Sequence, residues 1–137
     1  MSDQNKAIVR KLYEAMSTGN VGLVDDLIAS NFVDHEGLPG IDTNGPAGFK
    51  RLVSAFRAAF PDLKISAEDM IADGDKVAVR AVMRGTHKGE FMGVPATGKK
   101  FEIAGIDIIR FAGGKAVEHW GITDNMSMMQ QLGAMPS

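Results

Sequence analysis

The spacing of apolar residues changes at Pro61–Asp62, and this change constrains the fold more than any other feature of the sequence. Before it, apolar side chains recur every three or four residues, the period of an amphipathic helix; after it, they alternate with polar ones, the period of a strand. The predicted helices cover residues 2–18, 21–28 and 46–60. The predicted strands cover residues 63–72, 76–86, 99–111 and 115–123.

Helices followed by a run of strands predict an α+β fold, with a strongly bent antiparallel sheet packed on three N-terminal helices. Asp73–Gly74 and Gly113–Gly114 are typical of tight hairpin turns between the strands. Residues 87–98 form the only long connection and predict a flap. The length of 137 residues, without repeats or a linker, predicts one domain over residues 1–137.

The composition excludes several function classes. There is no cysteine, and 15 basic against 17 acidic residues are interspersed to a net charge of −2, so neither thiol chemistry nor nucleic-acid binding is expected. No apolar run is long enough to span a membrane, and no signal core is found in the charged first twenty residues, which predicts a cytoplasmic protein. The three histidines fall in different elements without a metal-ligand motif, so we expect no metal.

Carboxylates within the apolar strands are the most informative polar residues. Alternation along residues 101–111 places Asp107 on an otherwise apolar face. Alternation along the last strand places Glu118, Trp120 and Asp124 on one face and His119 on the other. A carboxylate among hydrocarbon side chains and beside a second carboxylate favours its neutral form, which suits a proton shuttle.

Structural roles for the same residues remain open from sequence alone. Asp107 could pair with Arg80 or Arg84 of the preceding strand, and Asp124 could be the N-cap of a short helix that begins at Asn125. His35 could donate a hydrogen bond at the mouth of a cavity or serve a purely structural role.

Several strings of residues carry a resemblance to a known family: Val9–Tyr13, Phe32–His35, Phe56–Asp62, the flap with residues 85–98, Gly105–Asp107 and Gly114–Trp120. Together they resemble the SnoaL-like polyketide cyclases of the nuclear transport factor 2-like superfamily over nearly the whole chain. The resemblance implies a cone-shaped α+β barrel around an apolar cavity, usually in a homodimer. It also implies a cofactor-independent enzyme of the lyase or isomerase type, active on a small apolar or aromatic ligand.

The implied reaction is an intramolecular aldol closure, in which a carboxylate removes a proton beside an ester or ketone. Asp124 is similar in position to the general base of the family, and Asp107 stands where many relatives carry a histidine that helps to hold the enolate. Tyr13 or His35 would donate to the developing oxyanion. The implied walls of the substrate site are Phe56, Phe60, Phe91, Glu118 and Trp120.

Other functions stay open on the same fold. The chain could bind a small hydrophobic ligand without catalysis, with its carboxylates neutralised by Arg80 or Arg84. It could instead be an isomerase or hydrolase of the superfamily, or a subunit that serves mainly to dimerise through the sheet. Apolar side chains on both faces of residues 76–86 are compatible with such a dimer.

Overall fold

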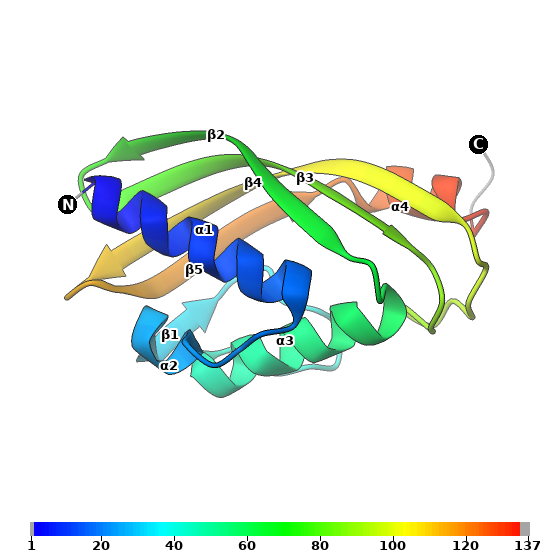
Figure 1. Cartoon of the computed structure of the whole chain (residues 1–137), viewed down its shortest axis with the longest axis horizontal. Helices are drawn as coiled ribbons and strands as arrows, with labels where there is room; N and C mark the ends of the chain where they lie inside the picture. Colours follow the sequence, from blue (N-terminus) through cyan, green and yellow to red (C-terminus); the bar gives the residue numbers. More distant parts are fainter. Residues whose placement is uncertain (1, 135–137) are drawn as a thin grey trace.

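The computed structural model describes residues 2–134 (Figure 1). Its helices are α1 (Ser2–Thr18), α2 (Val24–Leu27), α3 (Gly45–Ala59) and α4 (Asn125–Gln131). Its strands are β1 (Ile28–Asp34), β2 (Lys64–Asp73), β3 (Lys76–Thr86), β4 (Lys100–Ala112) and β5 (Lys115–Thr123). The mixed α+β class is confirmed, and β2 to β5 lie within one residue of the bounds predicted from alternation.

The second predicted helix is the main difference. Only Val24–Leu27 is helical, and Ile28 already begins β1. The residues from Ile28 onward pair with β5, and the β-branched Ile28 fits a strand as well as the end of a helix. The helix-like spacing of apolar residues therefore predicts a longer helix than the structure contains.

The five strands form one curved sheet in the order β1-β5-β4-β3-β2. Neighbouring strands are antiparallel except β1 and β5, which run parallel. The expectation of a purely antiparallel sheet is therefore wrong at this edge, because β1 reaches β5 through a long connection rather than a hairpin. The sheet bends around the helices without closing into a barrel (Figure 1).

The core lies between the concave face of the sheet and the two long helices, α1 and α3 (Figure 1). Alternate residues of β4 point into it, because side chains along a strand face opposite sides in turn. The inward residues include Phe101, Ile103, Ile109 and Phe111, each at most 5% exposed. Asp107 shares their parity, so the strand places a carboxylate at the inner face.

A register shift in β5 decides which of its side chains face inward. Phe111 pairs with Ala116 and Arg110 pairs with Glu118, so Val117 is an extra residue between the two pairs. Such a bulge changes the alternation of the strand on either side of it. As a result both Ala116 and His119 face the helices.

No helix within residues 2–134 is both long and apolar enough to cross a membrane.

Candidate active site

A pocket of about 290 Å³ opens between α1, α3 and the concave face of the sheet. Most of its wall is hydrocarbon, from residues such as Leu12, Phe32 and Ile109. Its charged and hydroxyl-bearing lining residues are Tyr13, Asp34, Glu36, Asp107, His119 and Thr123. An apolar pocket with a few converging polar groups is the usual form of a small-ligand site.

Asp107 lies at the centre of these polar groups. One carboxylate oxygen accepts a hydrogen bond from the Tyr13 hydroxyl, and the other accepts one from Nε2 of His119 at 2.8 Å. Its inward position is as predicted. The arginine partners considered for Asp107 lie elsewhere, since Arg80 binds Asp69 at 2.7 Å and Arg84 lies 3.6 Å from Glu102.

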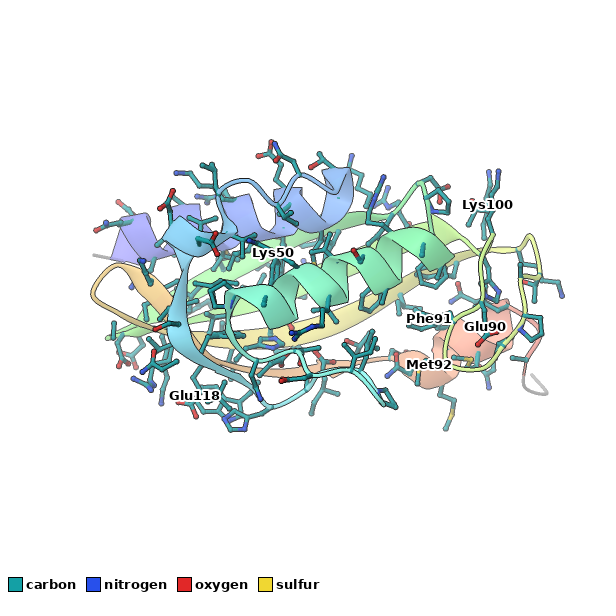
Figure 2. All side chains as sticks on the ribbon, turned by 90° about the horizontal axis from the view of Figure 1, so that it is seen from below. Lys50, Glu90, Phe91, Met92, Lys100 and Glu118 are labelled. Atoms are coloured by element: carbon teal, nitrogen blue, oxygen red, sulfur yellow. The ribbon has the colours of Figure 1, made fainter. Side chains whose placement is uncertain are left out.

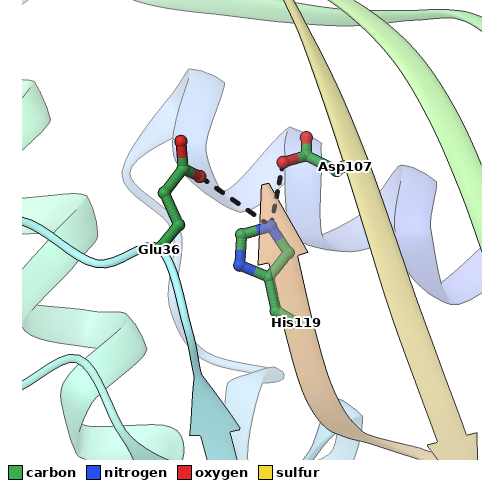
Figure 3. Close-up of side chains that lie close together, drawn as sticks. All are labelled: Glu36, Asp107 and His119. Atoms are coloured by element: carbon green, nitrogen blue, oxygen red, sulfur yellow. Dashed lines mark hydrogen bonds and ion pairs between the residues drawn. The ribbon is translucent and has the colours of Figure 1, made fainter. Parts of the chain in front are cut away.

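His119 is held between the carboxylates of Asp107 and Asp34, and Figure 3 shows the ring beside Asp107. Its Nε2 lies 2.8 Å from Asp107, and its Nδ1 lies 2.8 Å from Asp34. Ionised carboxylates only accept hydrogen bonds, so both ring nitrogens carry a proton and the ring is an imidazolium. Burial opposes this charge, but the hydrogen bonds and charges of Asp107 and Asp34 outweigh it and raise the pKa of His119 to about 10.

Asp34 fixes the far side of the imidazole. Its side chain is 4% exposed, and Oδ1 accepts hydrogen bonds from the backbone N–H groups of Glu36 and Gly37 at 3.0 and 3.2 Å. Burial alone would raise the pKa of Asp34, but the hydrogen bond and charge of His119 prevail and lower it. Asp34 is therefore a fixed negative charge that holds the ring in place.

Glu36 adds a third carboxylate beside the imidazole. Its Oε1 lies 4.0 Å from Nε2 of His119 (Figure 3), and its Oε2 accepts a hydrogen bond from Thr123 at 2.8 Å. Burial raises the pKa of Glu36, and the nearby charge of Asp107 adds to the effect. Gly121 makes room for this arrangement, because a Cβ there would lie 2.5 Å from Oε1 of Glu36 and 2.7 Å from Oδ1 of Asp107.

Tyr13 is the hydrogen-bond donor from the helical side of the pocket. Its side chain is buried, and its hydroxyl donates to Asp107. Burial and the negative charge of Asp107 raise the pKa of Tyr13 far above its ordinary value. The phenol is therefore a neutral donor at any physiological pH.

Asp124 does not lie where the family resemblance placed it. Its carboxylate is exposed and caps α4, accepting hydrogen bonds from the backbone N–H of Ser127 at 3.1 Å and from the Ser127 hydroxyl at 2.6 Å. These hydrogen bonds lower the pKa of Asp124. The prediction that Asp124 faces the cavity is therefore wrong, and the N-cap alternative describes its position.

His35, Glu118 and Trp120 also lie outside the pocket. The rings of His35 and Trp120 stack with centroids 5.2 Å apart, and Nε2 of His35 lies 2.7 Å from Glu118. For Glu118 and Trp120 the cause is the bulge at Val117, which turns the even-numbered residues after it to the outer face of the sheet. These residues cannot contact a ligand in the pocket as predicted.

Of the three phenylalanine residues predicted to form walls of the site, two line the pocket. Phe56 and Phe91 line the pocket as expected. Phe60 lies behind them, fully buried, with its ring centroid 4.9 Å from that of Phe91. It supports the wall without reaching the ligand space.

Sequence reasoning did not identify Asp34, Glu36 or Thr123 as site residues, and it placed His119 on the wrong face. The signal for Asp34 and Glu36 is weak, because both lie where a strand ends and alternation gives way to a turn. The run Asp34-His35-Glu36 does place two carboxylates with the same parity. Only the His35 between them is singled out by the sequence, as a residue at the end of an element that could line the mouth of a cavity.

Glu36, Asp107 and His119 could also contribute to a metal site. Their potential ligand atoms lie within 4.8 Å of one another. A metal ion would need the Nε2 lone pair of His119, so it would have to displace the proton that this nitrogen shares with Asp107. The expectation that no metal binds stays a prediction.

The fold and pocket define a class of protein: a curved sheet wrapped around two helices, with ionisable groups inside an apolar cavity. A family model described as SnoaL-like polyketide cyclase matches residues 6–132. This chain therefore belongs to the SnoaL-like polyketide cyclase family, as the resemblance indicated.

Named relatives agree with this assignment and support a cyclase role. The chain is 32% identical over 136 residues to the aklanonic acid methyl ester cyclase DauD of Streptomyces sp. strain C5, covering 92% of this chain and 80% of the relative. It is 31% identical to the nogalonic acid methyl ester cyclase of Streptomyces nogalater, covering 89% and 92%. The structure of IdmH from Streptomyces antibioticus superposes with a TM-score of 0.81 at 38% identity, covering 95% and 99%.

Proposed function

We propose that this protein catalyses an intramolecular aldol cyclisation of an apolar ketone or ester, with Asp107 as the general base. The observation that carries the proposal is the position of Asp107, a carboxylate inside an apolar pocket with two hydrogen-bond donors on it. The base role therefore passes from Asp124 to Asp107. Holding base, donors and substrate together replaces encounters in solution with one bound geometry.

The chemistry conserves every atom. Asp107 takes a proton from the carbon between two carbonyl groups, and the electron pair of that C–H bond becomes an enolate. Negative charge thereby leaves Asp107, so the hydrogen bonds of Tyr13 and His119 become free for the enolate oxygen. The enolate carbon attacks a carbonyl carbon of the same molecule, and Asp107 returns its proton to the new alkoxide.

The charge of the site favours an uncharged substrate. Asp34, Asp107 and Glu36 offer three carboxylates against one imidazolium. A substrate carboxylate in the same apolar pocket would meet uncompensated negative charge, which is costly at low dielectric constant. An esterified acid avoids this cost, and two relatives carry the words methyl ester in their names.

Ring closure is the direct test. We expect the protein to convert aklanonic or nogalonic acid methyl ester to a product of unchanged mass and altered chromatographic retention. In D₂O, substrate recovered before closure would gain deuterium at the acidic carbon. Neither closure nor deuterium uptake above the uncatalysed rate would contradict the proposal.

The positions of Arg80 and Arg84 do not favour the alternative function, ligand binding without catalysis. It required Arg80 or Arg84 to neutralise the pocket carboxylates, and both arginines pair with other acidic residues on the exposed side of the sheet. We therefore propose cyclisation of a ketone or ester rather than ligand binding alone.

We further propose a homodimer that pairs through the outer face of the sheet. Ile106 and Ile122 lie opposite each other on β4 and β5, and they are 49% and 80% exposed, with Ile108 alongside. An exposed apolar cluster of this kind favours burial against a partner.

We expect Ile122→Lys to convert a dimer to a monomer in sedimentation velocity, whereas Leu23→Lys, on the helical side, would leave the dimer intact.

A further inference from the structure

The flap over residues 87–98 is fastened to the core at its base. The backbone N–H groups of Lys88 and Gly89 donate to the carbonyl of Ala59 at 2.9 and 3.1 Å. The Phe91 ring is 5% exposed and lies against Phe56, with ring centroids 5.3 Å apart. Figure 2 shows Phe91 and Met92 in the flap beyond the end of α3, with Phe91 directed toward that helix.

The tip of the flap is a tight turn with an unusual residue in it. Phe91 and Val94 exchange backbone hydrogen bonds of 3.0 and 2.9 Å, which leaves Met92 and Gly93 as the two central residues. Both have positive φ, 51° and 80°, as in a type I′ turn, where Asn-Gly is the preferred pair. Within residues 2–134, Met92 is the only residue other than glycine with positive φ.

A bulky side chain in this backbone region is strained, and such strain persists where the surrounding structure or the function requires it. Turn formation does not require methionine here, because asparagine would satisfy the same geometry at lower cost. The Met92 side chain does have a distinct position: it lines the pocket while remaining 46% exposed. A flexible, polarisable thioether is well suited to contact an aromatic surface.

We propose that Met92 is a specificity-determining residue whose side chain covers a flat, apolar ligand at the mouth of the pocket. This contact with the ligand would explain why the turn contains methionine despite its unfavourable φ. The ligand class rests on the proposed function, but the contact itself does not depend on turnover.

The test combines two measurements on the unliganded and liganded protein. Met92→Asn relieves the turn and removes the apolar contact, so we expect the melting temperature to rise by about 3 °C. We expect the Kd for 1,8-dihydroxyanthraquinone, measured by isothermal titration calorimetry, to weaken about 10-fold. Met92→Leu keeps both the strain and an apolar side chain, so its melting temperature and Kd would stay close to those of the wild type.

Met126 provides a matched control, since it is 63% exposed on α4 and outside the pocket lining. Met126→Ala would leave the affinity for the quinone unchanged. Equal affinity of the wild type and Met92→Asn, no binding by the wild type, or a lower melting temperature in Met92→Asn would each overturn the proposal. Binding that depends on Met92 without any ring closure would support the contact and contradict only the aldol chemistry.

Discussion

Asp107→Asn is expected to lower kcat/KM for ring closure about 10³-fold while the protein remains folded. Asparagine has nearly the same shape and can still accept a hydrogen bond from Tyr13 or His119, but it cannot take a proton from carbon. The measurement is the initial rate of product formation with nogalonic acid methyl ester, accompanied by circular dichroism to verify the fold. A rate within a few-fold of the wild type would remove Asp107 from the mechanism.

Asp124 supplies the control for that experiment. Its carboxylate is exposed and caps α4, so Asp124→Ala is expected to leave the rate within about twofold while lowering the melting temperature slightly through the lost N-cap. If Asp124→Ala abolished turnover and Asp107→Asn did not, the assignment of the base would revert to the position that the family resemblance indicated.

The free energy of unfolding is expected to fall as pH rises from about 6.5 toward 10. The folded state holds a proton on His119 up to about pH 10, whereas the unfolded state releases it near 6.5. The folded state therefore binds more protons across this window, so the stabilisation is complete below pH 6.5 and is lost with rising pH. Each unit of difference between the folded and unfolded pKa corresponds to about 1.4 kcal/mol, so the loss across this window is a sizeable share of the stability of a typical domain.

Urea unfolding at pH 6.5, 8 and 9.5 measures this effect. His119→Gln removes the titrating group, so the variant would be less stable at pH 6.5 and nearly independent of pH up to 9.5. Tyr13 adds a further loss above pH 10, because its pKa is also raised in the folded state. A slope in His119→Gln equal to that of the wild type would show that the imidazole is not responsible.

The sequence was sufficient for most of the fold because apolar spacing reports directly on secondary structure. The switch at Pro61–Asp62 separates the long helices from β2 to β5, and alternation along β4 places Asp107 on the inner face correctly. The parallel pairing of β1 with β5 could not be predicted in the same way. It depends on where a short strand docks after a loop, and local periodicity carries no information about that.

The candidate site was harder to predict because one extra residue reverses the parity of a strand. The bulge at Val117 exchanges the expected positions of His119 and Trp120, and nothing in the residues 115–123 marks it. The two remaining carboxylates, Asp34 and Glu36, lie beyond the reach of alternation, at the end of β1. Only the assembled sheet brings them to His119.

The hydroxyl and carboxylate that meet in the pocket are 94 positions apart in the chain. Tyr13 comes from the first helix, Asp107 from β4, and the imidazole from the last strand. A nascent chain that ends before β5 would therefore carry the acid without its positive counter-ion. The three side chains therefore come together only once β5 has paired with β4.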